Sequence, residues 1–294
     1  MLKEKLITVL RIIFGKKPQI IKKPVIISQL GFTNLLSGKT ALITGGSSGI
    51  GYEIAKAMLT ADASVVITGR NKEKLKAACH ELERYVRNDN CINFNVLDIS
   101  NVESISSSFQ NIQSLLNNRQ IDILVNNAGT NGNGSGDFGE TTSEDFNLII
   151  DTNLRGTYFL SQIVAKYMVR KNIEGNILNI ASSSSLRPAN SPYILSKWGL
   201  RALTLGMAKT LIKYGITVNG IAPGPTATPM LNRTSDDINF PQNPSKRLST
   251  PEEIANMSVI LTSSLGKNIV GDILYMTGGA GVVTFDDAIY NFNI

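Results

Sequence analysis

Short apolar stretches alternate with amphipathic stretches along most of this chain, and this alternation constrains its fold more than any other feature. The apolar stretches are residues 39–44, 64–68, 91–96, 121–125, 176–180, 216–221 and 273–276. Each has the length of a strand, and apolar residues recur at helical spacing between them. Strands that alternate with helices are typical of βαβ units. We therefore expect an α/β fold with a doubly wound parallel sheet of about seven strands and helices on both faces.

Capping residues mark where several of the helices begin. The predicted caps and helices are Asn71 with 72–87, a capping box at Ser100 and Glu103, Thr142 or Ser143 with 143–170, and Thr250 with Pro251 at the first helical position. Another predicted helix carries Tyr193 and ends near residue 214. The stretch 223–244 is rich in Pro and Asn, so we expect an insertion that is too polar for the core.

The charge of the chain is concentrated at its N-terminal end. Seven Lys and Arg residues against Glu4 give residues 1–36 a charge of +6, which equals the formal charge of all 294 residues. The remaining residues are formally neutral, so a nucleic-acid partner is not expected. We predict a basic extension over residues 1–36 and one domain over residues 37–294.

The extension is partly amphipathic, since Leu2, Leu6 and Val9 share one helical face. Such a segment can lie on an anionic membrane surface, dock on the domain or on a second subunit, or form a disordered tail. A secretory signal is not expected, because Arg11 interrupts the apolar run and no small-residue cleavage site follows. No apolar run in the chain approaches the ~20 residues that span a bilayer.

Cysteine and histidine are too scarce for several kinds of site. Cys79 and Cys91 have no metal-ligand spacing, and they fit a reducing, cytoplasmic setting. His80 is the only histidine. We therefore expect neither a metal site nor a catalytic triad that contains histidine.

A glycine-rich turn, Gly45–Gly51, stands between the first predicted strand and the first predicted helix. Glycines there let the backbone approach a ligand, and a helix N-terminus offers N–H groups to phosphate. A plain tight turn is the alternative, but three glycines in this context favour a dinucleotide site. The same residues match G-x-S-x-G with Ser47 as a nucleophile. We reject that hydrolase interpretation, because the one histidine lies in the middle of a predicted helix.

Arg70 follows the second predicted strand, where a carboxylate that binds the ribose of NAD(H) would be expected. A guanidinium can instead bind a 2′-phosphate through two hydrogen bonds. The sequence therefore favours NADP(H) over NAD(H), although Arg70 could also be a solvated residue at the start of a helix.

Tyr193 and Lys197 are four residues apart and would share one face of a helix. A neighbouring ammonium favours the phenolate and is expected to lower the pKa of the phenol. The pair could then exchange a proton with a carbonyl or an alcohol. By itself the spacing is common in helices, and it gains weight from the other motifs.

Together these motifs resemble the short-chain dehydrogenase/reductase family over residues 38–294. The matching motifs are Thr44–Gly51, Asp98, Asn126-Asn127-Ala128-Gly129, Asn153, Asn179-Ile180-Ala181-Ser182, Tyr193-x-x-x-Lys197 and Asn219-x-Ile221-x-Pro223-Gly224. The resemblance implies a Rossmann fold and hydride transfer between a nicotinamide cofactor and a carbonyl or secondary alcohol. It also implies a homo-oligomer.

The resemblance assigns roles to individual residues. Tyr193 would be the general acid/base, Lys197 would lower its pKa and bind ribose, Ser182 would polarise the carbonyl, and Asn153 would hold a water. The implied cofactor-binding residues are Gly45, Ser47, Ser48, Gly49, Ile50, Gly51, Arg70, Asp98, Ile99, Asn126, Ala128, Gly129, Tyr193, Lys197, Pro223, Gly224, Thr226 and Thr228. The interval between Ser182 and Tyr193 is shorter than in many family members, so Ser183 or Ser184 could replace Ser182.

Polar residues dominate the segments expected near the substrate, among them Asn131, Arg187 and Asn190. They favour a polar substrate such as a sugar, polyol or oxo-acid derivative. A 3-oxoacyl thioester remains an alternative, because a fold does not select a substrate. A non-catalytic NADP(H) sensor or scaffold is the alternative from another class.

Overall fold

The computed structural model describes residues 32–132, 138–231, 233 and 238–283. Contacts divide the chain into two units, Met1–Gly31 and Phe32–Ile294. The first unit lies outside the described residues, so the docking of the basic extension stays a prediction. Residues 32–36, which the charge pattern assigns to the extension, belong to the second unit, where Leu36 is fully buried. Within the described residues, no helix is long and apolar enough to cross a membrane.

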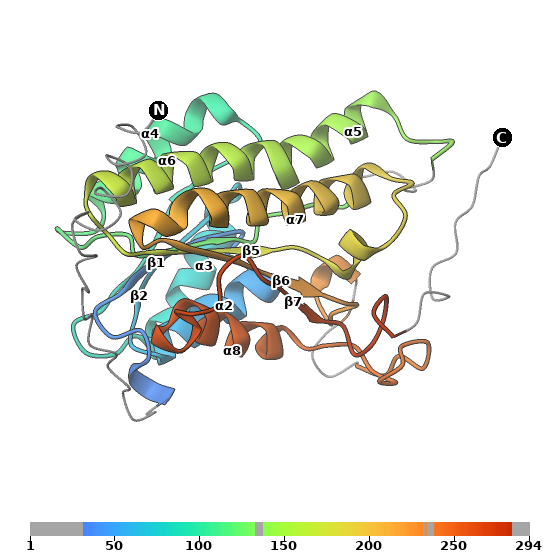
Figure 1. Cartoon of the computed structure of the whole chain (residues 1–294). Helices are drawn as coiled ribbons and strands as arrows, with labels where there is room; N and C mark the ends of the chain where they lie inside the picture. The colour runs from blue at the N-terminus through green and yellow to red at the C-terminus, as the bar shows by residue number, and fades with distance from the viewer. Residues whose placement is uncertain (1–31, 133–137, 232, 234–237, 284–294) are drawn as a thin grey trace, which may run out of the picture. The chain divides into compact units, whose positions relative to one another are not determined.

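Seven described strands form one sheet in the order β3-β2-β1-β4-β5-β6-β7, and all pairs are parallel (Figure 1). The strands are β1 (Thr40–Thr44), β2 (Ser64–Gly69), β3 (Ile92–Val96), β4 (Ile123–Asn126), β5 (Asn176–Ile180), β6 (Thr217–Pro223) and β7 (Ile273–Met276). The strand order reverses between β1 and β4, and ligands bind beyond the strand ends at such a point. The predicted doubly wound sheet is confirmed.

Helices cover both faces of the sheet (Figure 1). One face carries α2 (Gly49–Thr60), α3 (Lys72–Leu82) and α8 (Pro251–Thr262), and the other carries α4 (Val102–Ser114), α6 (Gly156–Arg170) and α7 (Pro192–Leu211). Ala41 and Ile43 of β1 pack in the first core, whereas Leu42 packs in the second. Successive side chains of a strand point to opposite faces, so burial on both sides requires the continuous apolar stretches seen in the sequence.

The predicted helix over 143–170 contains a wider turn. It consists of α5 (Ser143–Ile150), a π-helical turn at Asp151–Arg155, and α6. Gly156 packs directly against the backbone of Ile99, where a Cβ would overlap the carbonyl oxygen. The π-turn places Thr152 and Asn153 among the buried residues. Such turns recur at functional sites, and apolar periodicity alone does not locate them.

The capping box predicted at Ser100 and Glu103 is wrong. Helix α4 begins at Val102, and its N-cap Asn101 makes no side-chain capping bond. Ser100 lies one residue before the N-cap, and its hydroxyl donates to the carboxylate of Asp98 at 2.7 Å. The other predicted caps are formed at Asn71, Thr142 and Thr250. Helix α3 ends before the predicted residue 87 and is followed by a 3-10 turn at Glu83–Tyr85.

Replacing Gly51 by Ala should destabilise the fold, because the new Cβ would overlap the carbonyl oxygen of Gly45 and the side-chain amide of Asn127. Overpacking of this kind costs about 1–3 kcal/mol. Gly206→Ala in α7 is the matched control, since a Cβ there meets nothing within 4 Å. It should raise stability by about 0.5–1 kcal/mol. Urea unfolding of both variants measures the difference, and a Gly51→Ala variant as stable as the wild type would contradict the packing described.

Candidate active site

A cleft of about 830 Å³ opens beyond the carboxyl ends of the strands. Turns after β1, β2, β3, β4, β5 and β6 all contribute to its lining. The predicted residues that line it are Gly45, Ser47, Ser48, Gly49, Ile50, Arg70, Asp98, Ile99, Ala128, Gly129, Ser182, Tyr193, Lys197, Pro223, Gly224, Thr226 and Thr228. The structure therefore brings residues from nearly the whole length of the described domain to one place.

The glycine-rich turn forms one end of the cleft. Gly45 and Gly49 have φ angles of 67° and 57°, which glycine adopts without strain. The N-cap of α2, Ser48, makes no side-chain capping bond. Gly49 and Ile50, in the first turn of α2, line the cleft, and Ser48 does not cap the N–H groups of this turn, as an anion site at a helix N-terminus requires.

The turns after β1 and β4 are fastened together by Thr44 and Asn127. The Thr44 hydroxyl accepts hydrogen bonds from the backbone N–H groups of Asn127 and Ala128, each at 3.0 Å. In return, the Asn127 side chain donates to the carbonyl oxygens of Thr44 at 2.9 Å and Gly45 at 3.1 Å. These bonds fix the floor of the cleft beside the glycine-rich turn.

Arg70 lines the cleft together with Asn71 and Lys74, which lies in the first turn of α3. Two cations therefore face the space beyond β2. Asp98 and Ile99 line the same end after β3, and the Asp98 carboxylate also accepts from the backbone N–H of Ser100 at 3.0 Å.

Three predicted residues, Gly51, Asn126 and Asn153, do not line the cleft. Gly51 lies behind the glycine-rich turn, in contact with Gly45. Asn126 is buried and donates to the side chains of Ser161 and Asn179, both at 2.8 Å. Its side chain thus links β4 to α6 and β5.

Asn153 is buried in the π-turn and ties the loop after β4 to α7. Its side chain accepts from the backbone N–H of Thr130 at 2.8 Å and donates to the carbonyl of Thr130 at 3.0 Å. It also donates to the hydroxyl of Ser196 at 3.1 Å. A Cβ on Gly129 would lie 3.3 Å from the side-chain oxygen of Asn153 and 3.8 Å from the Lys197 ammonium. Asn153 and Lys197 therefore flank the same glycine.

Helix α7 carries the Tyr193–Lys197 pair, and its N-cap Ser191 accepts from the backbone N–H of Ile194. The Lys197 ammonium lies 5.6 Å from the centre of the Tyr193 ring and donates to the carbonyl of Ile180 at 3.1 Å. The side chains of Ser182 and Tyr193 are hydrogen-bonded to each other. This bond favours Ser182 over its two serine neighbours as the partner of Tyr193.

Burial dominates the protonation of this pair. It raises the pKa of Tyr193, and the hydrogen bond from Ser182 offsets only part of that rise. Burial also lowers the pKa of Lys197 from 10.5 to about 8. The expected lowering of the Tyr193 pKa is therefore not found in this structure, because desolvation of the phenolate outweighs the stabilising contacts.

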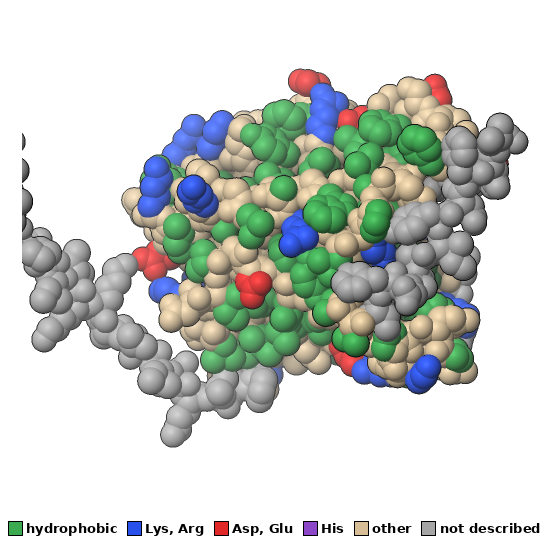
Figure 2. Space-filling view, turned by 45° about the vertical axis from the view of Figure 1, so that its right-hand side comes forward, with side chains coloured by type: hydrophobic (Ala, Val, Ile, Leu, Met, Phe, Trp, Pro, Cys, Tyr) green, Lys and Arg blue, Asp and Glu red, His purple; other side chains and the backbone are tan. Residues whose placement is uncertain are grey.

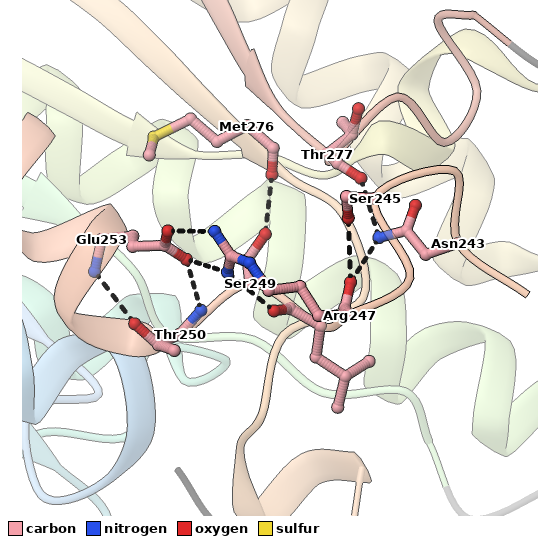
Figure 3. A network of polar contacts seen from close by, with 9 residues as sticks. Asn243, Ser245, Arg247, Ser249, Thr250, Glu253, Met276 and Thr277 are labelled. Carbon is pink, nitrogen blue, oxygen red and sulfur yellow. Dashed lines mark hydrogen bonds and ion pairs between the residues drawn. The ribbon is translucent and has the colours of Figure 1, made fainter. Parts of the chain in front are cut away.

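The stretch after β6 forms the rim of the cleft, and its returning part is anchored to β7 and α8 (Figure 3). Asn243 donates to the carbonyls of Arg247 at 2.7 Å and Thr277 at 3.2 Å. Arg247 binds the Glu253 carboxylate through two hydrogen bonds, at 2.6 and 2.8 Å. Glu253 also closes the capping box with Thr250.

The rim corrects part of the sequence prediction. Thr226, Ala227, Thr228 and Asn243 are buried, although the stretch 223–244 was expected to be too polar for the core. Ala227 donates to the carbonyl of Ser249 at 2.9 Å, and this pairing holds Thr226 and Thr228 along the cleft. Pairing with the returning segment provides hydrogen bonds for backbone groups of this stretch, which composition alone does not show.

Several lining residues were absent from the predicted site. Lys74 could have been found, because the first turn of a helix that follows a strand lies at the carboxyl edge of the sheet. Asn127 belongs to the recognised Asn126–Gly129 motif, but its bonds depend on β1 lying beside β4. Within the described residues, no group of three or more His, Cys, Asp or Glu side chains could hold a metal ion.

Comparison with known proteins agrees with this geometry. A sequence model of the short chain dehydrogenase family matches residues 39–239. Gluconate 5-dehydrogenase from Gluconobacter oxydans (strain 621H) is 33% identical over 254 residues, which cover 84% of this chain and 96% of that protein. The 3-oxoacyl-(acyl-carrier-protein) reductase of Aquifex aeolicus (strain VF5) is 33% identical over 252 residues, covering 83% and 98%.

A crystal structure of a short-chain dehydrogenase from Burkholderia cenocepacia J2315 in complex with NADP is also similar. It has a TM-score of 0.74 and 28% sequence identity, and the match covers 84% of this chain and 99% of that one. The chain belongs to the short-chain dehydrogenase/reductase family. It is therefore an oxidoreductase that binds a nicotinamide cofactor and acts on hydroxyl or keto groups.

Replacing Lys197 by Met should stabilise the protein near pH 7, because the folded state then no longer buries an ammonium. Between pH 8 and about pH 10.5 the Lys197 side chain is protonated in the unfolded chain but not in the folded protein, so the penalty for burying Lys197 falls as the pH rises through this window. The advantage of Lys197→Met should be on the order of 3 kcal/mol below pH 8 and should shrink toward pH 10.

Urea unfolding between pH 7 and pH 10 measures this change. Lys209→Met, at an exposed position on the same helix, is the control and should show a difference from the wild type that does not vary with pH. An advantage of Lys197→Met that stays constant over this range would show that Lys197 keeps an ordinary pKa.

Proposed function

We propose that this chain is an NADP(H)-dependent ketoreductase or alcohol dehydrogenase whose substrate is a small polar molecule, such as a sugar, polyol or oxo-acid derivative. The observation that carries the proposal is the convergence of Ser182, Tyr193 and Lys197 on one wall of the cleft that begins at the glycine-rich turn. The name of the gluconate dehydrogenase relative supports a polar substrate.

The cleft fits a dinucleotide. The positive φ angles of Gly45 and Gly49 and the N-terminus of α2 suit a pyrophosphate. Asp98 and Ile99 would lie against the adenine end, and Thr226 and Thr228 would lie near the nicotinamide end. Pro223 and Gly224 would line the same end. Gly224 packs closely on Thr277 there, since a Cβ added to Gly224 would be 2.8 Å from the Cα of Thr277.

The cofactor supplies hydride transfer to or from the carbon of the substrate. Ser182 would donate a hydrogen bond to the carbonyl oxygen and polarise it. Tyr193 would give its phenolic proton to that oxygen in reduction and take it back in oxidation. Its raised pKa keeps the phenol protonated at neutral pH, which suits the direction of reduction.

Lys197 would stabilise the charge that develops on Tyr193 when the proton leaves. Its ammonium lies 5.6 Å from the ring centre, close enough for attraction in a buried site. We propose that Asn153 acts as a positioning residue, since it fastens Thr130 to Ser196, the neighbour of Lys197. A water held by Asn153 stays a prediction.

The preference for NADP(H) rests on Arg70 and Lys74. Both line the cleft beyond β2, and no carboxylate among the described lining residues comes from the end of that strand. A guanidinium and an ammonium there would attract a 2′-phosphate. The similar structure that was determined with NADP is consistent with this preference.

A 3-oxoacyl thioester is the second candidate substrate. Met230 and Leu231 line the cleft, and they are 52% and 45% exposed. They offer apolar contact to an acyl chain, and a relative of this chain is named as a 3-oxoacyl-(acyl-carrier-protein) reductase. The non-catalytic sensor would require a broken catalytic group, whereas Ser182, Tyr193 and Lys197 are all in place.

We propose that the protein is a homo-oligomer. Hydrophobic side chains gather on the face that α6 and α7 form, as Figure 2 shows. The exposed large hydrophobic side chains of these two helices are Tyr158, Leu195, Trp198 and Leu205. A second copy packed on this face would remove these side chains from water. The cytoplasmic location stays a prediction.

Tyr193→Phe should lower NADPH-dependent turnover of a ketone substrate by about 100-fold or more, because general acid catalysis is lost. NADPH should still bind, since the ring is retained. Tyr214→Phe is the control, because Tyr214 is exposed and lies outside the cleft. The measurement is NADPH oxidation across a panel of keto-sugars, diketones, oxo acids and a 3-oxoacyl thioester. Equal turnover by Tyr193→Phe and wild type would refute the assigned role.

Arg70→Met should raise the KM for NADPH by about 10-fold or more, because a charge-assisted bond to phosphate contributes about 1.5–3 kcal/mol. The KM for NADH should stay unchanged. Lys72→Met is the control, since Lys72 is exposed at the start of α3 and does not line the cleft. Equal changes for NADPH and NADH would show that Arg70 does not read the 2′-phosphate.

A further inference from the structure

The charges that line the catalytic end of the cleft are positive. Of the described lining residues, Asp98 is the one acid, and it lies at the cofactor end after β3. Lys197 and Arg187 are the charged lining residues that come from the segments after β5. A cleft lined by one sign of charge concentrates ligands of the opposite sign. This end of the cleft is therefore suited to an anion.

The backbone of Arg187 is held firmly. Its N–H donates to the carbonyl of Ser184 at 3.1 Å, which closes the 3-10 turn Ser183–Leu186. Its carbonyl accepts from the indole N–H of Trp198 at 2.7 Å, and Trp198 directly follows Lys197 in α7. Two contacts thus fix the position from which the guanidinium extends, one to the serine turn and one to the catalytic helix.

The guanidinium lies beside the segment that carries Ser182. A Cβ on Gly281 would lie 3.5 Å from Arg187 Nε, 3.7 Å from Nη2 and 3.8 Å from the carbonyl oxygen of Ser183. The guanidinium and the residue after Ser182 therefore flank the same glycine. The Nε atom is buried, so a charge here is less screened than on the surface.

We propose that Arg187 binds a carboxylate of the substrate, so that the natural substrate is an oxo acid or hydroxy acid with a free carboxylate. The inference rests on the proposed function of this cleft and narrows its substrate class. An arginine fork matches the two oxygens of a carboxylate, and Ser182 and Tyr193 would meet the carbonyl at the other end of the same molecule. Arg187 would thereby set which carbon faces the cofactor.

The kinetic test compares matched pairs of substrates with the full chain and saturating NADPH. Acetoacetate and 4-oxopentanoate are each paired with their neutral methyl esters. The wild type should favour each acid over its ester by about 10-fold or more in kcat/KM. Arg187→Met should raise the KM for the acids by about 10-fold or more, and should leave the kcat/KM of the esters within about twofold.

Two variants separate charge from folding. Arg187→Lys should restore part of the preference for acids, because an ammonium keeps the charge but loses the paired hydrogen bonds. Arg170→Met removes an exposed arginine at the far end of α6 and should leave all four substrates unchanged. An unchanged KM for the acids in Arg187→Met, or equal use of acids and esters by the wild type, would overturn the proposal.

A binding measurement does not depend on turnover. Calorimetry of the full chain with NADP⁺ compares gluconate with glucitol, which has a neutral CH₂OH group where gluconate has its carboxylate. Gluconate should bind more tightly than glucitol to the wild type, and equally weakly to Arg187→Met. Loss of all turnover with retained selective binding would refute the proposed reaction but support the anion site. Equal binding of both compounds by the wild type would overturn the anion site.

Discussion

The close contact between the turns after β1 and β4 sets the position of the rest of the cleft. Thr44 and Asn127 exchange hydrogen bonds across this contact, and Gly45 and Gly51 allow it by having no Cβ. The contact exists because β1 and β4 are adjacent strands whose chain connections run in opposite directions from the switch point. The N-terminus of α2, the loop that reaches Asn153 and the glycine beside Lys197 all continue from these two turns.

The sequence predicts the fold well because burial on both faces leaves a strong pattern. All seven strands appear where apolar stretches stand, and the ranges 176–180 and 273–276 coincide with β5 and β7. The caps at Asn71, Thr142 and Thr250 are also formed, since each depends only on local residues. The box at Ser100 fails because α4 begins at Val102 with Asn101 as its N-cap, one residue beyond Ser100, and the π-turn at Asp151–Arg155 depends on packing between distant segments.

In the site, too, some properties follow from neighbouring residues in the sequence, and others depend on contacts between distant segments. The spacing of Tyr193 and Lys197 places them one helical turn apart, and the structure keeps them on one wall of the cleft. Burial dominates their protonation and depends on the folded structure, so the direction in which the Tyr193 pKa shifts does not follow from spacing. Arg187 becomes informative only when the fold brings Gly281, about 90 residues downstream, and Trp198, in the following helix α7, beside it.

The rim of the cleft is anchored at its two ends, and the residues between the anchors can vary. The bridge between Thr226 and Ser249 and the network of Asn243, Arg247 and Glu253 hold both ends of this excursion against β7 and α8. Because closing a longer loop between fixed ends adds little entropic cost, residues between these anchors can be exchanged, shortened or extended without moving the segment next to the cleft. Loop grafting between the anchors would therefore change the lining of the rim while Ser182, Tyr193 and Lys197 keep their positions.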